Sequence, residues 1–280
     1  RGGSNERRDN YYNAVLAFYG AWLRDQAQNR GLGFVDMYGP LNAHTIEQRK
    51  TDPKFTLIKD AVHPGANGQV VMAFSILQDM GVERSVSAIN AVFQREKWKV
   101  TGKGKISEVE GDATSLSFSF KANSLPWVLP PDAALGFKLT KAGHKLSNER
   151  VRIAGLTPGK YELRIDGESV GTWTHVTLGA KIELQSNPKT PQYKQALAVA
   201  MLNAERNAKA VRPLRNHWSG MKRQLRSKDK NPEKFANYQI EFDKKLAELK
   251  SSIDSYEDRI YQSNQPRSHR YEIVRATGNK

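Results

Sequence analysis

Apolar and polar residues recur with two different periods along the 280-residue chain, and the changes of period divide it into three parts. Over residues 5–30 the apolar positions lie three and four residues apart, which predicts an amphipathic helix that ends near Gly31. Its apolar stripe consists of Tyr11, Val15, Phe18 and Trp22, widened by Leu16, Tyr19 and Leu23. Further helices are predicted over 41–49 and 67–80, and a helical linker over 86–92.

A short apolar run between glycines, residues 33–38, interrupts these helices. Its length and its flanking glycines are typical of a buried parallel strand. Helix, strand, loop and helix in this order predict the closing half of a doubly wound α/β sheet over residues 1–92. Asp36 lies near the end of the predicted strand, where we expect a solvated or capping carboxylate rather than a site residue.

The period changes to two between about residues 97 and 185. Alternating runs predict several short strands, with turns at Pro158-Gly159 and Asp166-Gly167. Short strands at this spacing predict an antiparallel β-sandwich over residues 93–186. We expect Trp98 and Trp173 in its core, and Trp127, which lies between prolines, in packing rather than stacked on a sugar.

Helical spacing returns in the basic region 187–280. Thr190 is the predicted N-cap of a helix that begins at Pro191, and Pro213 predicts a kink or a restart. A long helix is predicted over 232–262, because its apolar residues repeat at spacings of three and four. We expect an antiparallel helical hairpin, followed by a tail at 269–275 that alternates and can add a strand to the β module.

Composition restricts the chemistry. The chain is 38% hydrophobic and 26% charged, which is ordinary for a globular protein, and it has no apolar run long enough to span a bilayer. The absence of cysteine excludes a disulfide, a thiol nucleophile and a cysteine-ligated metal. His44 has no further ligand at metal spacing, so we interpret it as a surface residue and expect no metal site. No signal peptide is visible; a secreted or periplasmic location is favoured if one precedes Arg1.

The formal net charge of +15 attracts polyanions without specifying one. Basic residues are concentrated near Trp218, with Asp229 as the one acid among them: Arg212, Arg215, Lys222, Arg223, Arg226, Lys228 and Lys230. A solvated helix face explains such a cluster, and nucleic-acid binding is disfavoured because no nucleic-acid motif accompanies it. Binding of an acidic polysaccharide is a further alternative.

The segment from Lys59 to Gly68 carries the candidate chemistry. Asp60 precedes His63 by three residues, and an apolar helix follows. Pro64 disfavours the α conformation for His63, and the two glycines permit backbone conformations that other residues avoid. An imidazole held on such a loop is a candidate general base. The alternative is an ordinary loop histidine beside an aspartate that precedes a helix.

Asp-x-x-His-Pro, followed by Gly/Ala-rich residues and an apolar helix, resembles the last signature block of the SGNH (GDSL-type) esterase/lipase family. The resemblance covers residues 10–82 and implies a flavodoxin-like three-layer α/β fold, of which this chain would hold the C-terminal portion. It implies that His63 is the general base of a Ser-His-Asp triad, that Asp60 orients it, and that no metal or cofactor takes part. Residues 155–171 resemble β modules that follow some bacterial SGNH domains.

Three other blocks of that family, with the nucleophilic serine and the Gly and Asn oxyanion donors, are not found in the sequence. Ser4 is too close to His63 to be the nucleophile, and Asn5 is rejected as an oxyanion donor. We therefore expect a fragment or a processed chain, inactive alone, from an enzyme that hydrolyses acyl esters, with carbohydrate deacylation as one form of that activity. The rival hypothesis is a non-catalytic module that binds a polyanion or a partner protein through residues 97–280.

Overall fold

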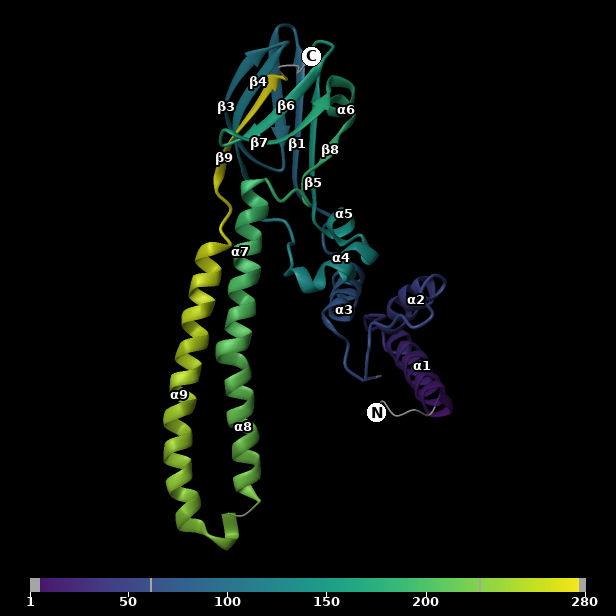
Figure 1. The fold of residues 1–280 in the computed structure, drawn as a ribbon, viewed down its shortest axis with the longest axis vertical. Helices are drawn as coiled ribbons and strands as arrows, with labels where there is room; N and C mark the ends of the chain where they lie inside the picture. Colours follow the sequence, from purple (N-terminus) through teal and green to yellow (C-terminus); the bar gives the residue numbers. More distant parts are fainter. Residues whose placement is uncertain (1–5, 61, 227, 277–280) are drawn as a thin grey trace.

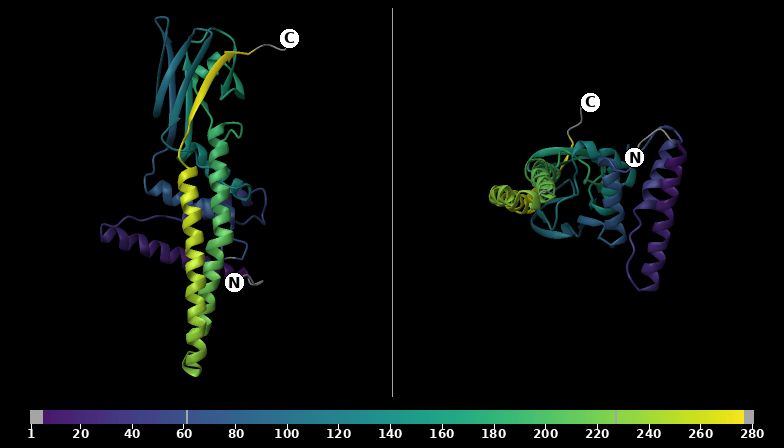
Figure 2. Two further views of the ribbon diagram at one scale, coloured as in Figure 1. Left: turned by 90° about the vertical axis from the view of Figure 1, so that its left-hand side faces the viewer. Right: turned by 90° about the horizontal axis from the view of Figure 1, so that it is seen from below.

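The computed structural model describes residues 6–60, 62–226 and 228–276, and these fold into the three parts shown in Figure 1. A β-sandwich occupies one end of the molecule, and a long helical hairpin projects from it. The N-terminal helices lie on the opposite side of the molecule from the hairpin (Figure 2). The fold is therefore mixed α/β, with two sheets and several helices.

The N-terminal part contains the three helices that the apolar spacing predicts. They are α1 (Glu6–Asn29), α2 (Tyr38–Arg49) and α3 (Ala66–Asp79). The predicted parallel strand over 33–38 is wrong, because residues 32–36 are irregular and pair with no described strand. A strand needs a neighbour to satisfy its backbone groups, and the first described strand of either sheet begins only at Ser85.

Asp36 caps the start of α2, as expected. Its Oδ1 accepts a hydrogen bond from the backbone N–H of Gly39 at 2.8 Å. Its own backbone N–H donates to Oδ2 of Asp79 at 3.0 Å, which ties the irregular segment to the end of α3. His44 on α2 is half-buried, so it is partly covered rather than fully exposed at the surface. Burial, followed by the charge of Lys145, lowers the pKa of this imidazole.

The predicted helical linker over 86–92 is also wrong, because this segment lies inside β1 (Ser85–Gln94). Its inward positions include Ser85, Ser87 and Ala91. Because these residues are small or polar, the spacing of large apolar side chains does not show the period of two. The β module thus begins at residue 85 rather than 93. Helices α4 (Ala134–Thr140) and α5 (Ala142–Leu146), which the sequence did not predict, connect this module to α3.

Two sheets face each other in the β module. The first has the order β2 (Lys97–Gly102), β1, β5 (Asn148–Ala154) and β8 (Ile182–Glu183). The second has the order β3 (Gly104–Asp112), β4 (Ser115–Ala122), β9 (Ser268–Arg275), β6 (Lys160–Ile165) and β7 (Glu168–Thr174). Among the described strands the pairs are antiparallel except for β1 with β5, which is parallel. The predicted sandwich and the predicted tail strand are both present, but the expectation of a purely antiparallel module is wrong, because β1 and β5 run parallel.

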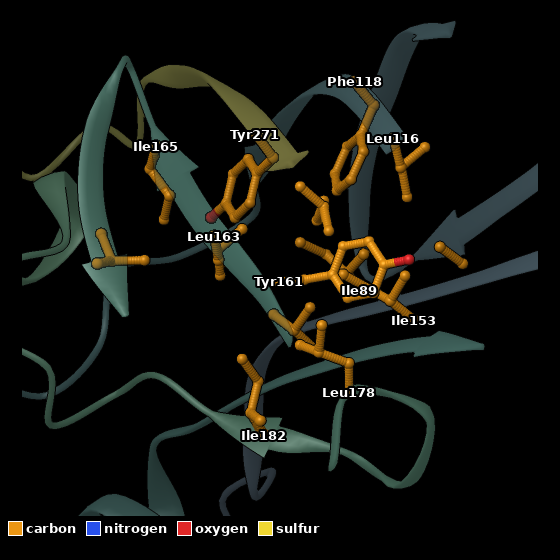
Figure 3. Close-up of a cluster of buried hydrophobic side chains, with 14 of the residues drawn as sticks. Ile89, Leu116, Phe118, Ile153, Tyr161, Leu163, Ile165, Leu178, Ile182 and Tyr271 are labelled. Carbon is orange, nitrogen blue, oxygen red and sulfur yellow. The ribbon is translucent and has the colours of Figure 1, made fainter. Parts of the chain in front are cut away.

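The main core lies between these sheets (Figure 3). Phe118, Tyr161, Leu163 and Ile273 from one sheet and Ile153 from the other have no exposed surface. Trp98 and Trp173 pack against this core, as expected. Trp127 packs edge-on against Phe137 at a ring-centroid distance of 5.8 Å, in a smaller cluster with Phe74 of α3, so its packing role is also confirmed.

The predicted hairpin is confirmed. Its first arm consists of α7 (Pro191–Arg206), a π-helical turn (Asn207–Val211) and α8 (Arg212–Leu225), and its second arm is α9 (Pro232–Ser263). Thr190 caps α7 by accepting a hydrogen bond from the N–H of Tyr193. Pro213 has no N–H to donate to the preceding turn, which accounts for the π-helical turn just before it. No described helix has the length and hydropathy needed to cross a membrane.

Candidate active site

Asp60 and His63 lie on the loop between α2 and α3, and local hydrogen bonds determine its shape. Oδ1 of Asp60 accepts from the backbone N–H groups of Val62 at 3.0 Å and His63 at 2.7 Å. The N–H of Gly65 donates to the carbonyl of Leu57 at 3.1 Å and closes the loop on α3. A Cβ on Gly68 would lie 2.8 Å from that same carbonyl, so the close approach of loop and helix requires glycine there.

The same aspartate also holds the imidazole. Nδ1 of His63 lies 2.7 Å from Oδ2 of Asp60. A hydrogen on Nδ1 that donates to the carboxylate leaves the lone pair on Nε2, which is the arrangement that a general base requires. The imidazole is 81% exposed, and no described residue forms a hydrogen bond with Nε2. The pair can therefore accept a proton from a group that approaches from outside the loop.

Hydrogen bonds to Asp60 keep its carboxylate ionised. The backbone N–H of His63 contributes most, the imidazole of His63 and the N–H of Val62 contribute further, and together they hold the pKa of Asp60 well below its usual range. An ionised carboxylate beside Nδ1 stabilises the imidazolium that forms when Nε2 takes a proton.

The described residues bring no nucleophile to this pair. No hydroxyl of a described serine or threonine forms a hydrogen bond with His63. Ser4 and Asn5, which the sequence analysis rejected as nucleophile and oxyanion donor, lie outside the described residues. Among the described residues, no three histidines, aspartates or glutamates lie close enough together to hold a metal ion.

The apolar stripe of α1 lies next to this loop region and is largely uncovered. Tyr11 is 74% exposed, Phe18 68% and Trp22 51%. A hollow of about 540 Å³ runs from α1 to residues 34–38 and Met72. A second hollow, of about 460 Å³, lies between α1 and α2 and reaches Lys59, the residue before Asp60. Large exposed apolar surfaces of this kind mark contacts with another polypeptide or a ligand.

One solved structure resembles this chain. It is described as "BT4096 a gut microbial diltiazem-metabolizing enzyme" and superposes with a TM-score of 0.75 at 24% sequence identity. The match covers 92% of this chain and 65% of the other, so this chain spans just under two thirds of that protein's length. At this identity the likeness shows a shared fold. No protein-family model and no curated protein matches the chain.

Two further histidine–carboxylate pairs were missed by the sequence analysis, since their members are far apart in the chain. Nδ1 of His269 lies 2.6 Å from Oδ2 of Asp166, whose other oxygen accepts from the N–H of Arg270 and thereby anchors β9. Nδ1 of His144 lies 2.9 Å from Glu183. Burial would raise the pKa of Glu183, but hydrogen bonds from His144 and Gln185 lower it to about 2. Both pairs join separate elements of the fold, whereas Asp60 and His63 join none.

Proposed function

We propose that this chain supplies the general base and its orienting carboxylate to a serine esterase of the SGNH type. The observation that carries the proposal is the 2.7 Å contact between Nδ1 of His63 and Asp60, on a loop that leaves the imidazole 81% exposed. Two features of the sequence support it: the Asp-x-x-His-Pro block and the helix that follows. The fold shared with a protein described as a drug-metabolizing enzyme is in keeping with an enzymatic role.

The reaction follows from the chemistry of the pair. A serine hydroxyl attacks the acyl carbonyl while Nε2 of His63 takes its proton, and the imidazolium then returns that proton to the leaving alcohol. Water hydrolyses the acyl-enzyme by the same steps. Asp60 holds the imidazole in one orientation and balances its positive charge. Donors on other residues would hold the oxyanion. The substrate is an acyl ester, and carbohydrate O-acyl groups are the first class to test.

We further propose that the serine belongs to a polypeptide segment outside these 280 residues. The uncovered apolar stripe of α1 and the irregular segment 32–36, which lacks a strand partner among the described residues, support a docking surface for an α/β segment. A Gly-Asp-Ser block and a Gly-x-Asn-Asp block encoded in frame before Arg1 would provide such a segment.

Ester hydrolysis of p-nitrophenyl acetate tests the proposal, with diltiazem and acetylated polysaccharides as further substrates. We expect the 280-residue chain to show no saturable activity, and a longer chain with the two upstream blocks to be active. In the longer chain, His63→Ala should lower kcat by about 10³-fold or more. Free imidazole should restore part of the rate, because the exposed loop leaves room for it.

Asp52→Asn is a matched control for Asp60→Asn. Asp52 also accepts a backbone N–H two residues ahead, at 3.1 Å, but it faces no histidine. We expect a loss of activity with Asp60→Asn and none with Asp52→Asn. Full activity of His63→Ala, or saturable hydrolysis by the 280-residue chain that survives this substitution, would refute the proposal.

A further inference from the structure

The outer face of α8 carries two groups of basic residues, one at each end of the helix, on the same side. At 3.6 residues per turn, five cationic side chains fall within an arc of about 100° and extend over roughly 21 Å along the helix. These are Arg212, Arg215, Lys222, Arg223 and Arg226. We call this surface the α8 stripe. Helix α8 contains no aspartate or glutamate, so the arc has a single sign of charge.

The cations of the α8 stripe are free to bind a partner. All five side chains are exposed, and none forms an ion pair or a hydrogen bond with a described residue. Neighbouring cations of the hairpin are engaged instead: Arg206 pairs with Glu257, and Lys209 pairs with Glu205 at 2.6 Å. The stripe is therefore not used to hold the two arms of the hairpin together.

Trp218 and Leu225 lie along one edge of the α8 stripe, 45% and 51% exposed. The indole of Trp218 packs edge-on against Phe242 of α9 at a centroid distance of 5.0 Å, so its position beside the cations is defined. Phe242 itself is buried under His217, whose ring stacks on it at 4.0 Å. The exposed surface of α8 thus combines a row of cations with one aromatic ring that is held in a fixed position.

We propose that the α8 stripe binds an acidic polysaccharide. A linear polymer with sulfate or carboxylate groups fits a straight row of cations, and a sugar ring can pack on the indole of Trp218. Binders of single-stranded nucleic acid present several stacking aromatics, while α8 exposes one. Helices that bind a bilayer keep their apolar face free for lipid, whereas Met221 on the apolar face of α8 is buried in the hairpin.

This inference is independent of the esterase proposal, and binding alone tests it. The probes are heparin and polygalacturonate, with single-stranded DNA and phosphatidylserine vesicles as competing anions. The stripe variant is Arg215→Gln/Lys222→Gln/Arg223→Gln/Arg226→Gln. A matched control removes four exposed lysines of the β module: Lys97→Gln/Lys99→Gln/Lys105→Gln/Lys121→Gln. Each variant changes the net charge from +15 to +11, since four of the cations are removed.

We expect the stripe variant to bind heparin or polygalacturonate at least about tenfold more weakly than the unmodified chain, with a shallower dependence on salt, and the control variant to stay within about twofold. Trp218→Ala should weaken binding without changing the salt dependence, because it removes an uncharged contact. Equal losses in the stripe and control variants would overturn the proposal.

Two other results would also overturn it. One is tighter binding to DNA or to vesicles than to both polysaccharides at the same salt concentration. The other is a dimer of the free chain in sedimentation velocity that the stripe variant abolishes, since the α8 stripe would then face a second copy. Thermal melting of each variant tests whether the fold is retained, which we expect for substitutions at exposed positions.

Discussion

The ring of Tyr271 stacks on that of Phe118, with the centroids 5.2 Å apart and the planes at 10° to each other. The two residues are also Cα partners in the pairing of β4 with β9. This places the last described strand in the middle of the five-stranded sheet, between β4 and β6. The helical hairpin is thus an insertion between β8 and β9, and both of its ends are anchored in the sandwich (Figure 1).

The central position of β9 predicts a large effect of its core residues on stability. Ile273 is completely buried, so Ile273→Ala should lower the free energy of unfolding by about 2–5 kcal/mol, through lost apolar burial and the cavity that remains. Ile240 of α9 is 67% exposed, and Ile240→Ala should change it by less than about 0.5 kcal/mol. Urea unfolding measures both. Equal effects would show that β9 is not a core strand in solution.

Glu149 predicts a decrease of stability with rising pH. This carboxyl lies in β5, hydrogen-bonded to Ser87 at 3.3 Å, and its burial raises its pKa from 4.5 to about 7. As pH rises, the unfolded chain loses this proton before the folded chain does. The free energy of unfolding is therefore highest below about pH 4.5 and falls as pH rises to about 7. Above that pH, Glu149 causes no further change. The difference of roughly 2.5 in pKa corresponds to about 3 kcal/mol as an upper bound.

Glu149→Gln should therefore remove most of this pH dependence. The amide is neutral at every pH, so the variant should be more stable than the unmodified chain at pH 8 and similar to it at pH 4.5. Glu168→Gln, at an exposed position of β7, is the control and should leave the profile unchanged. Thermal denaturation between pH 4 and 8 measures the three profiles. An unchanged profile for Glu149→Gln would contradict the assignment of this carboxyl as the titrating group.

The sequence predicted features that depend on residues close together along the chain, and it missed those that depend on residues far apart. In β4 the large residues Leu116, Phe118 and Phe120 alternate with serines and are all buried, so the period of two predicted this strand directly. In β1 the inward residues are mainly serine and alanine, and the same period was not recognised. The parallel pairing of β1 with β5 depends on contacts more than 50 residues apart, which local periodicity does not encode.

The same rule applies to the candidate site. Asp60 and His63 are three residues apart, so a loop that starts with an aspartate already predicts their contact. His269 and Asp166 are equally close in space but separated by 103 residues, and no local pattern indicated them. The strand expected over 33–38 failed for a different reason. Its sequence has the pattern of a buried strand, but no described strand is available to pair with it.

The contact between Asp60 and His63 makes a prediction that needs no catalytic activity. With Oδ2 of Asp60 at 2.7 Å, Nδ1 should carry the hydrogen whenever the imidazole is neutral. Two-dimensional ¹H–¹⁵N NMR of the 280-residue chain at alkaline pH reads the tautomer of His63 directly. Asp60→Ala should shift the population toward the Nε2–H form, and Asp52→Ala should leave it unchanged. An Nε2–H tautomer in the unmodified chain would mean that the pair is not arranged as a catalytic base.

The exposed apolar side chains of α1 predict self-association that substitution can remove. Phe18 and Trp22 are 68% and 51% exposed, so the unmodified chain should bind an apolar dye and associate with rising concentration in sedimentation experiments. Phe18→Lys/Trp22→Lys should reduce both effects. Because neither side chain is buried, the free energy of unfolding should change by less than about 0.5 kcal/mol per substitution. A loss of about 2 kcal/mol or more would show that these residues pack inside this chain instead. In a longer, active chain the same substitutions should lower esterase activity. There the apolar residues of α1 would contact the segment that carries the serine.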